Sequence, residues 1–156
     1  MIKVSRLADY AVVVLATLAR QPEELLTAAS VSARTNFPEP TVAKVLKLLA
    51  RDNLISSIRG VNGGYRLTKQ VSDISIADII MAVDGPISLT TCVEGNSNTC
   101  DYACHCPVKG RWDGVNLAIR EALEGVMLSD MISGHASPAK AGGLQVPAYA
   151  GKADMP

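Results

Sequence analysis

Four cysteines, all that the 156-residue chain contains, lie within the fifteen residues from Cys92 to Cys106. The stretch reads TCVEGNSNTCDYACHCP, and seven, three and one residues separate successive cysteines. Glycine, serine and asparagine between the first two cysteines favour turns, so the segment can fold back and bring its sulphur atoms together. Thiolates are the soft ligands that zinc and iron–sulphur clusters select. The stretch is therefore expected to be a metal-binding loop around which the chain is organised.

Three other uses of these cysteines compete with an iron–sulphur cluster. Two disulfides are typical of small secreted proteins, and we find no convincing export signal. A zinc site is usually built from pairs of cysteines two to four residues apart, which this spacing fits poorly. Free or redox-active thiols are the third possibility. The spacing favours an iron–sulphur cluster, of the 2Fe-2S or 4Fe-4S type, and leaves zinc and a thiol switch as alternatives.

The first apolar run, AVVVLATLA, follows Lys3 and Arg6 and loosely resembles a signal peptide. Asp9 stands close before this run, which is much shorter than the roughly 20 residues of a membrane span. Apolar residues recur at helical spacing after Ser5, a favourable N-cap. We therefore expect an amphipathic first helix in a cytoplasmic protein that makes no use of a membrane. Its buried stripe is expected to comprise Leu7, Ala11, Val14, Leu15 and Leu18.

The next segment has the pattern of two short helices joined by a turn. Thr27 can cap the first helix, and Asn36 and Phe37 form the turn. The second helix opens near Pro38 or Pro40, where proline costs no hydrogen bond. Such a pair, with basic and small polar groups on the second helix, is typical of a helix-turn-helix. The second helix is expected to bury Val42, Val45, Leu46 and Leu49, and to leave Thr41, Lys44, Lys47 and Arg51 on its other faces.

A glycine-rich hairpin is expected directly after these helices. Ile55–Arg59 and Tyr65–Leu67 have strand composition, and the residues between them, GVNGG, form a turn sequence. A hairpin in this place is typical of the wing of a winged helix, whose arginines can enter a minor groove. The alternative is a plain hairpin with solvated arginines. The expected DNA contacts are Thr41, Lys44, Lys47 and Arg51 from the helix, and Arg59, Gly60 and Asn62 from the wing.

The charge distribution supports a polyanionic partner for the first half of the chain. Residues 1–70 carry ten Lys and Arg against five Asp and Glu, and residues 71–156 carry the reverse. A basic half of +5 in a formally neutral chain favours contact with double-stranded DNA. The chain has only two histidines and shows neither a nucleotide-binding loop nor paired catalytic carboxylates. An enzyme is therefore not expected.

The second half is expected to hold the cysteine loop and a long helix. Ser75 can cap the helix IADIIMAVD, which Gly85 and Pro86 end. After the loop, Pro107 is expected to start the long helix. A narrow apolar seam on it would suit pairing with a second copy in a homodimer, although packing on the same chain is the alternative. The seam comprises Trp112, Val115, Ile119 and Val126.

Together these patterns predict a mainly α protein with a small β-hairpin wing. A winged helix-turn-helix domain is expected over residues 1–84, and the cysteine loop and dimerisation helix over residues 85–132. Residues 133–156 are rich in Gly, Ala, Pro and Lys without periodicity, which predicts a disordered tail.

The order of these motifs resembles the IscR/NsrR-type family of bacterial winged-helix regulators. The similarity rests on DYAVVVLATLA, TVAKVLKLLARDNLISSIRGVNGGYRL, ISIADIIMAVDGPI and a cysteine loop followed six residues later by Trp112. It covers roughly residues 1–130, and the chain looks most like regulators of the SUF iron–sulphur assembly system. The resemblance implies a homodimer with a long crossing helix, a cluster near the dimer face and transcriptional control of cluster-assembly genes.

The resemblance also implies three cluster ligands, at Cys92, Cys100 and Cys106. Some members carry a histidine three residues after the third cysteine. Here that position is Lys109, which cannot be a ligand while protonated, and Cys104 is an additional thiol. The fourth ligand is therefore open among Cys104, His105 and Asp9.

Asp9 is the fourth ligand that the resemblance favours. Certain nitric-oxide-sensing members supply a carboxylate there from the partner subunit. As an exposed residue of a first helical turn, Asp9 would simply favour the helix dipole. The recognition helix carries Ala43 where some members present glutamate, so their operator preference does not transfer.

The sequence thus predicts a cluster-dependent transcription factor whose cluster state alters the placement of two recognition helices. A winged-helix regulator with zinc or a thiol switch is the alternative. A third class is a winged-helix adaptor that binds protein and carries a structural metal.

Overall fold

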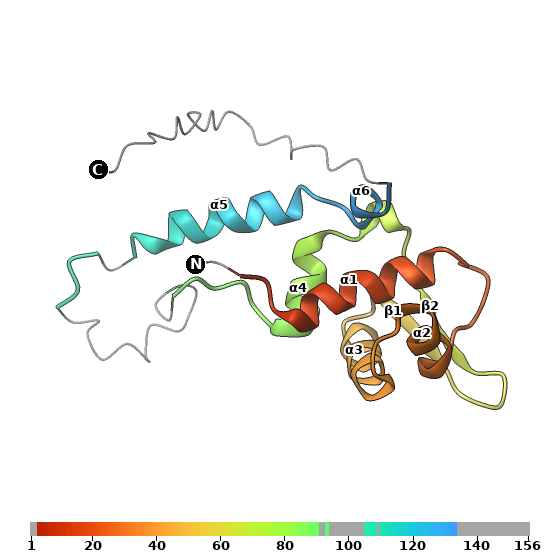
Figure 1. Ribbon diagram of the computed structural model, residues 1–156. Helices are drawn as coiled ribbons and strands as arrows, with labels where there is room; N and C mark the ends of the chain where they lie inside the picture. Colours follow the sequence, from red (N-terminus) through yellow and green to blue (C-terminus); the bar gives the residue numbers. More distant parts are fainter. Residues whose placement is uncertain (1–2, 91–92, 94–104, 109, 134–156) are drawn as a thin grey trace, which may run out of the picture.

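The computed structural model describes residues 3–90, 93, 105–108 and 110–133. Helices α1 to α4 and the hairpin pack together, and α5 follows as a separate long helix that contacts α4 (Figure 1). The prediction of a mainly α protein with a small hairpin is confirmed. The elements are α1 (Arg6–Ala19), α2 (Ala28–Thr35), α3 (Glu39–Arg51), β1 (Ile55–Ile58), β2 (Gly64–Leu67), the 3-10 turn η1 (Val71–Asp73), α4 (Ile76–Asp84), α5 (Trp112–Glu124) and α6 (Leu128–Ser133).

Hydroxyl caps start three of the helices where the sequence predicts them. The Ser5 side chain accepts a hydrogen bond from the backbone N–H of Ala8 at 3.0 Å, and Thr27 caps α2 in the same way. Ser75 and Asp78 form a reciprocal capping box at the start of α4. Each cap satisfies a backbone donor that the first helical turn leaves without a partner, and so defines where the helix begins.

The core forms where the apolar stripes of α1, α3 and α4 meet. Ala11, Val14, Leu15 and Leu18 of α1 are buried as predicted, whereas Leu7 is half-buried and Ala8 is buried beside them. All four predicted residues of α3 are fully buried. Burying a side chain of this size stabilises the fold by about 1.5–3 kcal/mol. The remaining large side chains of the core include Leu26, Ile55, Ile74, Ile79 and Leu128.

The wing is a two-stranded antiparallel hairpin that a third chain segment supports. Ile55 pairs with Leu67 and Ile58 with Gly64, so the turn runs between Ile58 and Gly64. Leu26, just before α2, forms a bridge with Tyr65 through two hydrogen bonds of 2.9 and 3.1 Å. Tyr65 is the second residue of β2, so the hairpin is attached to the segment before α2 close to its turn.

Helix α5 begins later than the sequence predicts. The expected start was Pro107, but residues 107, 108, 110 and 111 form turns and the helix starts at Trp112. Gly110 has a φ of +73°, in the left-handed region, which an α-helix does not allow. The helix also ends at Glu124, so Val126 lies beyond the helix that was expected to carry it.

The chain after α5 returns to the winged helix and forms α6, which the sequence did not predict. Leu128 donates its N–H to the carbonyl of Ile74 at 2.8 Å, and its side chain is fully buried. Asp130 accepts from the N–H of Met127 at 2.9 Å and starts the helix. The predicted tail began at Ser133, which is instead the last residue of α6, and the rest of the tail lies outside the described residues.

The return of α6 bears on the predicted domain boundary. That boundary, after residue 84, coincides with the end of α4 at Asp84. However, α6 belongs to the second predicted unit and packs against η1 and α1 of the first. The two units therefore share part of one core.

Replacing Leu128 by Ala tests this attachment. Because the side chain is fully buried, the substitution should lower the free energy of unfolding by about 2–5 kcal/mol, measured by chemical denaturation. Ile132→Ala is the matched control on the same helix, because Ile132 is 42% exposed and should cost less than about 1 kcal/mol. Equal losses for the two variants would contradict the docking of α6.

Candidate DNA-binding surface and cysteine loop

The turn between α2 and α3 is held by local contacts that the sequence explains. Asn36 ends α2 in the left-handed conformation, with a φ of +58°, which asparagine tolerates better than most residues. The Ser32 hydroxyl donates to the carbonyl of Phe37 at 2.6 Å. The Phe37 ring lies 4.3 Å from that of Tyr10, between centroids. The start of α3 is therefore attached to α1 through an aromatic contact.

Helix α3 presents a polar face opposite its buried stripe. Ala43, Lys44 and Lys47 are exposed, and Thr41 is half-buried. Glu39, in the first turn, is also exposed. Sequence reasoning missed Glu39, although an acidic side chain at the start of a recognition helix can accept a hydrogen bond from cytosine. The exposed side chains offer both positive charge and hydrogen-bonding groups to a partner.

Arg51 differs from the other predicted DNA contacts on α3. Its Nη2 donates to the carbonyl of Ala82 at 3.1 Å, and it lies 3.5 Å from Asp52 Oδ2. The guanidinium thus ties the end of α3 to the last turn of α4. The sequence could not show this bond because the partner is a backbone group 31 residues away.

The tip of the wing is a tight, exposed turn. Arg59, Gly60 and Asn62 are all exposed, as their predicted role requires. Gly60 has a φ of +121°, which residues with a side chain rarely adopt. A side chain at Gly63 would clash with the carbonyl oxygen of Ile58, so the turn can close this tightly only with glycine there.

Val61 at the tip of the wing is a further candidate that sequence reasoning missed. Its relative exposure is 104%, the highest among the exposed large hydrophobic residues of the described part of the chain. An apolar side chain between a glycine and an asparagine in a turn is the signal that could have indicated it. Apolar wedges of this kind contact sugars and base steps in minor grooves.

Only part of the cysteine loop is described. Cys106 is half-buried with a free thiol, and His105 is exposed. Cys92, Cys100, Cys104 and Lys109 lie outside the described residues. Within the described ranges, no three His, Cys, Asp or Glu side chains form a group that could hold a metal ion. The proposed ligand set is therefore supported by the kind of its donors, which suit iron and sulphide, and its geometry stays a prediction.

Asp9 is exposed in the first turn of α1, on a hollow of about 480 Å³. The hollow lies between α1, α2 and α6, and its apolar part includes Val12, Ala16 and Met131. Arg34 on its rim pairs with Glu24 at 3.4 Å. Asp9 is therefore accessible to a partner, as a ligand supplied between subunits would have to be.

The predicted seam of α5 divides into an exposed and a covered part. Trp112 and Val115 are 41% and 46% exposed. Ile119 is half-buried and, with Ile80 of α4, lines a hollow of about 200 Å³. Val126 lies after the helix, where its carbonyl accepts from the N–H of Ile76 at 2.9 Å. The first half of the seam thus remains accessible while the second packs on its own chain.

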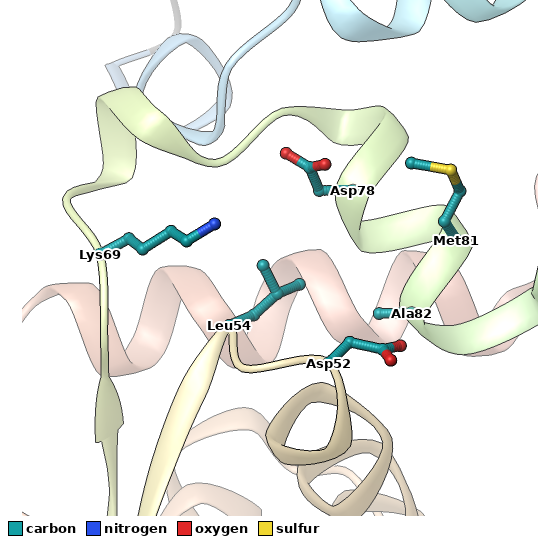
Figure 2. A pocket seen from close by; sticks show the side chains of 6 residues that line it. All are labelled: Asp52, Leu54, Lys69, Asp78, Met81 and Ala82. Carbon is teal, nitrogen blue, oxygen red and sulfur yellow. The ribbon is translucent and has the colours of Figure 1, made fainter.

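A further hollow of about 240 Å³ lies between the end of α3 and α4 (Figure 2). Lys69 reaches into it from the segment after β2, and Asp52 and Asp78 contribute carboxylates. Asp78 Oδ2 already accepts from the N–H and hydroxyl of Ser75, at 3.0 and 2.8 Å. Asp78 therefore serves the capping of α4, and we assign the hollow no ligand.

No helix in the described part of the chain is both long enough and apolar enough to cross a membrane.

Comparisons with known proteins agree with this architecture. The sequence model of the Rrf2 family, described as an iron-dependent transcriptional regulator, matches residues 4–134. Regulators named NsrR from Halalkalibacterium halodurans and Shouchella clausii are each 30% identical to the chain. The matches span 126 and 127 residues, which cover 80% of this chain and 86% and 84% of the relatives.

Two solved structures share the fold at comparable identity. CymR, described as the global cysteine regulator of B. subtilis, has a TM-score of 0.64 at 28% identity and covers 85% of this chain and 98% of its own. IscR of T. potens has a TM-score of 0.62 at 27% identity, covering 85% and 88%. These relatives are regulators, which supports the expectation that the chain is not an enzyme. The chain therefore belongs to the Rrf2 family and is a transcriptional regulator of the IscR/NsrR type.

Proposed function

We propose that this protein is a homodimeric transcription factor whose cysteine loop holds an iron–sulphur cluster, and that cluster-assembly genes of the SUF type are its targets. The observation that carries the DNA-binding part is the exposed polar face of α3, presented beside an exposed wing tip by a fully buried stripe. The four clustered cysteines support the cofactor. The iron-dependent description of the family supports it as well.

In the proposed complex, the start of α3 enters a major groove. Thr41 and Lys44 would face base edges, and Lys47 would contact phosphate. Arg51 keeps further N–H donors beyond its bond to Ala82, so it can also approach a phosphate.

The wing would reach the neighbouring minor groove. Arg59 is proposed to insert there, while Gly60 and Asn62 let the backbone approach the sugars. Val61 would add an apolar contact at the floor of the groove. Because the hairpin is joined to Leu26 by two hydrogen bonds, the tip is held at a set distance from α3.

The proposed cluster ligands are Cys92, Cys100 and Cys106, with Asp9 of the partner subunit as the fourth and Cys104 or His105 as competitors. A bound cluster would supply a centre whose assembly and loss respond to iron, sulphide and oxidants. Cys106 lies six residues before Trp112, the first residue of α5, so a change at its thiol bears directly on the start of that helix.

The exposed half of the α5 seam supports the proposed dimer. Trp112 and Val115 are three residues apart on one side of the helix, and both are exposed in the single chain. Pairing with a second copy would bury this apolar pair and place two cysteine loops near the same interface. Asp9 could then act across subunits.

A thiol switch without a cluster is the second candidate function. It is favoured by the half-buried free thiol of Cys106 and by the similarity to CymR, a cysteine regulator. A zinc site is a further form of this alternative. In both forms the DNA-binding surface is the same.

The first test concerns the cofactor. Protein purified without oxygen should be brown and contain iron and acid-labile sulphide, because soft thiolates stabilise such clusters. Cys104→Ser should retain the absorption spectrum, and Asp9→Ala should make the cluster labile. Stoichiometric zinc without sulphide would instead favour the alternative, and loss of the cluster in Cys104→Ser alone would indicate an all-cysteine site.

The second test concerns DNA binding. Arg59→Ala should weaken operator binding by about 1–3 kcal/mol if the side chain reads a groove, as measured by fluorescence anisotropy. Lys47→Ala should weaken binding to all DNA sequences alike. It should also reduce the slope of log affinity against log salt concentration by about 1, the value for one lost phosphate contact. Arg111→Ala is the matched control, because Arg111 is exposed beside α5 and away from the proposed surface. An Arg59 variant that binds like the wild type would refute the wing contact.

The third test concerns the dimer. Val115→Glu should shift the protein to monomers in analytical ultracentrifugation, because it would place a charge in the proposed apolar interface. Leu117→Glu is the matched control, since Leu117 is 54% exposed but lies on another side of α5. If both variants remain dimeric, Val115 is not part of the interface.

A further inference from the structure

Asn116 is the only buried residue of α5, and its side chain forms hydrogen bonds with two backbone groups. It is 2% exposed. Its Nδ2 donates to the carbonyl of Ile87 at 3.0 Å, and its Oδ1 accepts from the N–H of Leu89 at 3.1 Å. One amide thus holds two backbone groups of the segment after α4 against the helix.

These two hydrogen bonds join the two ends of the cysteine loop. Leu89 lies three residues before Cys92, and Asn116 lies ten residues after Cys106. Closing a flexible loop costs conformational entropy that grows with its length. Because Asn116 holds residues 87–89 on α5, the two ends of the loop are already close together. Binding a ligand in the loop then costs less conformational entropy.

On its N-terminal side, the segment of residues 85–89 continues directly from the last turn of α4. That turn forms hydrogen bonds with residues at the start of α1 and at the end of α3. The Ser5 hydroxyl, at the start of α1, donates to Asp84 Oδ1 at 2.8 Å. Arg51, at the end of α3, donates to the carbonyl of Ala82 at 3.1 Å. Figure 1 shows α4 between α5 and α3. Hydrogen bonds therefore connect α5 to the recognition helix through one turn of α4.

Because the Asn116 amide is buried, the link between α5 and α4 is sensitive to displacement of residues 87–89. If residues 87–89 shift away from α5, the donor and the acceptor of Asn116 lose their partners in a buried place, which costs about 1–3 kcal/mol for each group. The bonded arrangement is therefore favoured over small displacements. A change in the cysteine loop that moves its ends must break both bonds or carry α4 with it.

We infer that Asn116 is a positioning residue that transmits the state of the cysteine loop to α3 through the last turn of α4. The inference rests on the proposed function, since it assigns the residue through which the loop would regulate DNA binding. The two hydrogen bonds of Asn116 that the described part of the chain shows go to Ile87 and Leu89, which are neither proposed ligands nor proposed DNA contacts.

The experiment compares operator affinity in two states of each variant, namely protein reconstituted with ferrous iron and sulphide under anaerobic conditions and protein freed of metal by a chelator. The duplex is one that the wild-type protein selects from random sequences. Asn116→Leu removes both hydrogen bonds at similar volume, and Asn116→Asp keeps the acceptor for Leu89 but loses the donor for Ile87. Glu121→Gln, exposed on the same helix, is the matched control.

We expect the ratio of the two affinities to fall toward one in Asn116→Leu, to take an intermediate value in Asn116→Asp and to stay unchanged in Glu121→Gln. Metal-free affinity should stay within about threefold of wild type, because the loss is one of coupling between sites. The N–H of Leu89 should exchange with solvent faster in Asn116→Leu only, as followed by NMR. If Asn116→Leu does not fold, the intermediate ratio of Asn116→Asp carries the test.

The outcomes separate this inference from the proposed function. A wild-type protein with equal affinity in both states would overturn control by the cluster, and the inference with it. A large wild-type ratio that both Asn116 variants retain would overturn the inference alone. Unchanged exchange of the Leu89 N–H in Asn116→Leu would show that the two bonds do not hold the segment.

Discussion

The burial of one face of α3 against α1 is the constraint on which the proposed DNA-binding surface depends. Val42, Val45, Leu46 and Leu49 are completely buried, so the rotation of α3 about its axis is determined by packing. At 3.6 residues per turn, this orientation leaves Ala43, Lys44 and Lys47 toward solvent. A charged residue in the buried stripe would therefore disturb both the stability of the core and the direction in which the basic side chains point.

The last turn of α4 connects three other helices, α1, α3 and α5. It receives a hydrogen bond from Arg51 of α3 and one from Ser5 of α1, and it continues into the segment that Asn116 holds on α5. The Arg51 and Ser5 bonds have a backbone and a carboxylate acceptor, respectively. The helices of the proposed DNA-binding surface and the helix that carries the proposed dimer seam are thus joined through polar contacts rather than through a shared apolar core alone. Polar contacts of this kind depend strongly on geometry, which suits the coupling that we propose between the loop and α3.

Membership of the Rrf2 family establishes a transcriptional regulator. It does not decide whether the cysteines hold a cluster, bind zinc or act as a thiol switch. The relatives include NsrR and IscR, and also CymR, described as a cysteine regulator, so one winged-helix scaffold accompanies different named regulators. The proposed DNA-binding surface belongs to the packed part of the fold. The chemistry of the loop depends on which donor residues its short sequence carries, so it can differ between proteins that share the fold.

Local rules of the sequence determined the helix-turn-helix and the wing. The caps at Ser5, Thr27 and Ser75, the stripe of α3 and the glycines of the hairpin act within a few residues, and each was found where it was predicted. Apart from Thr41, which is half-buried, the predicted DNA contacts on α3 are exposed as helical periodicity implies, and those of the wing are exposed in its turn. These features could be predicted because the physical cause and its effect lie close together in the chain.

Tertiary structure alone decided how the second half attaches to the first. The docking of Leu128 beside Ile74, the bond from Arg51 to Ala82 and the two bonds of Asn116 all join residues that are far apart in sequence. An asparagine in an amphipathic helix is typical of a solvated position, and only the approach of residues 87–89 makes it the buried residue of α5. The sequence determined which segments could form elements, because hydrogen bonding and periodicity are local. Their contacts required the fold, because burial depends on what the rest of the chain places against each side chain.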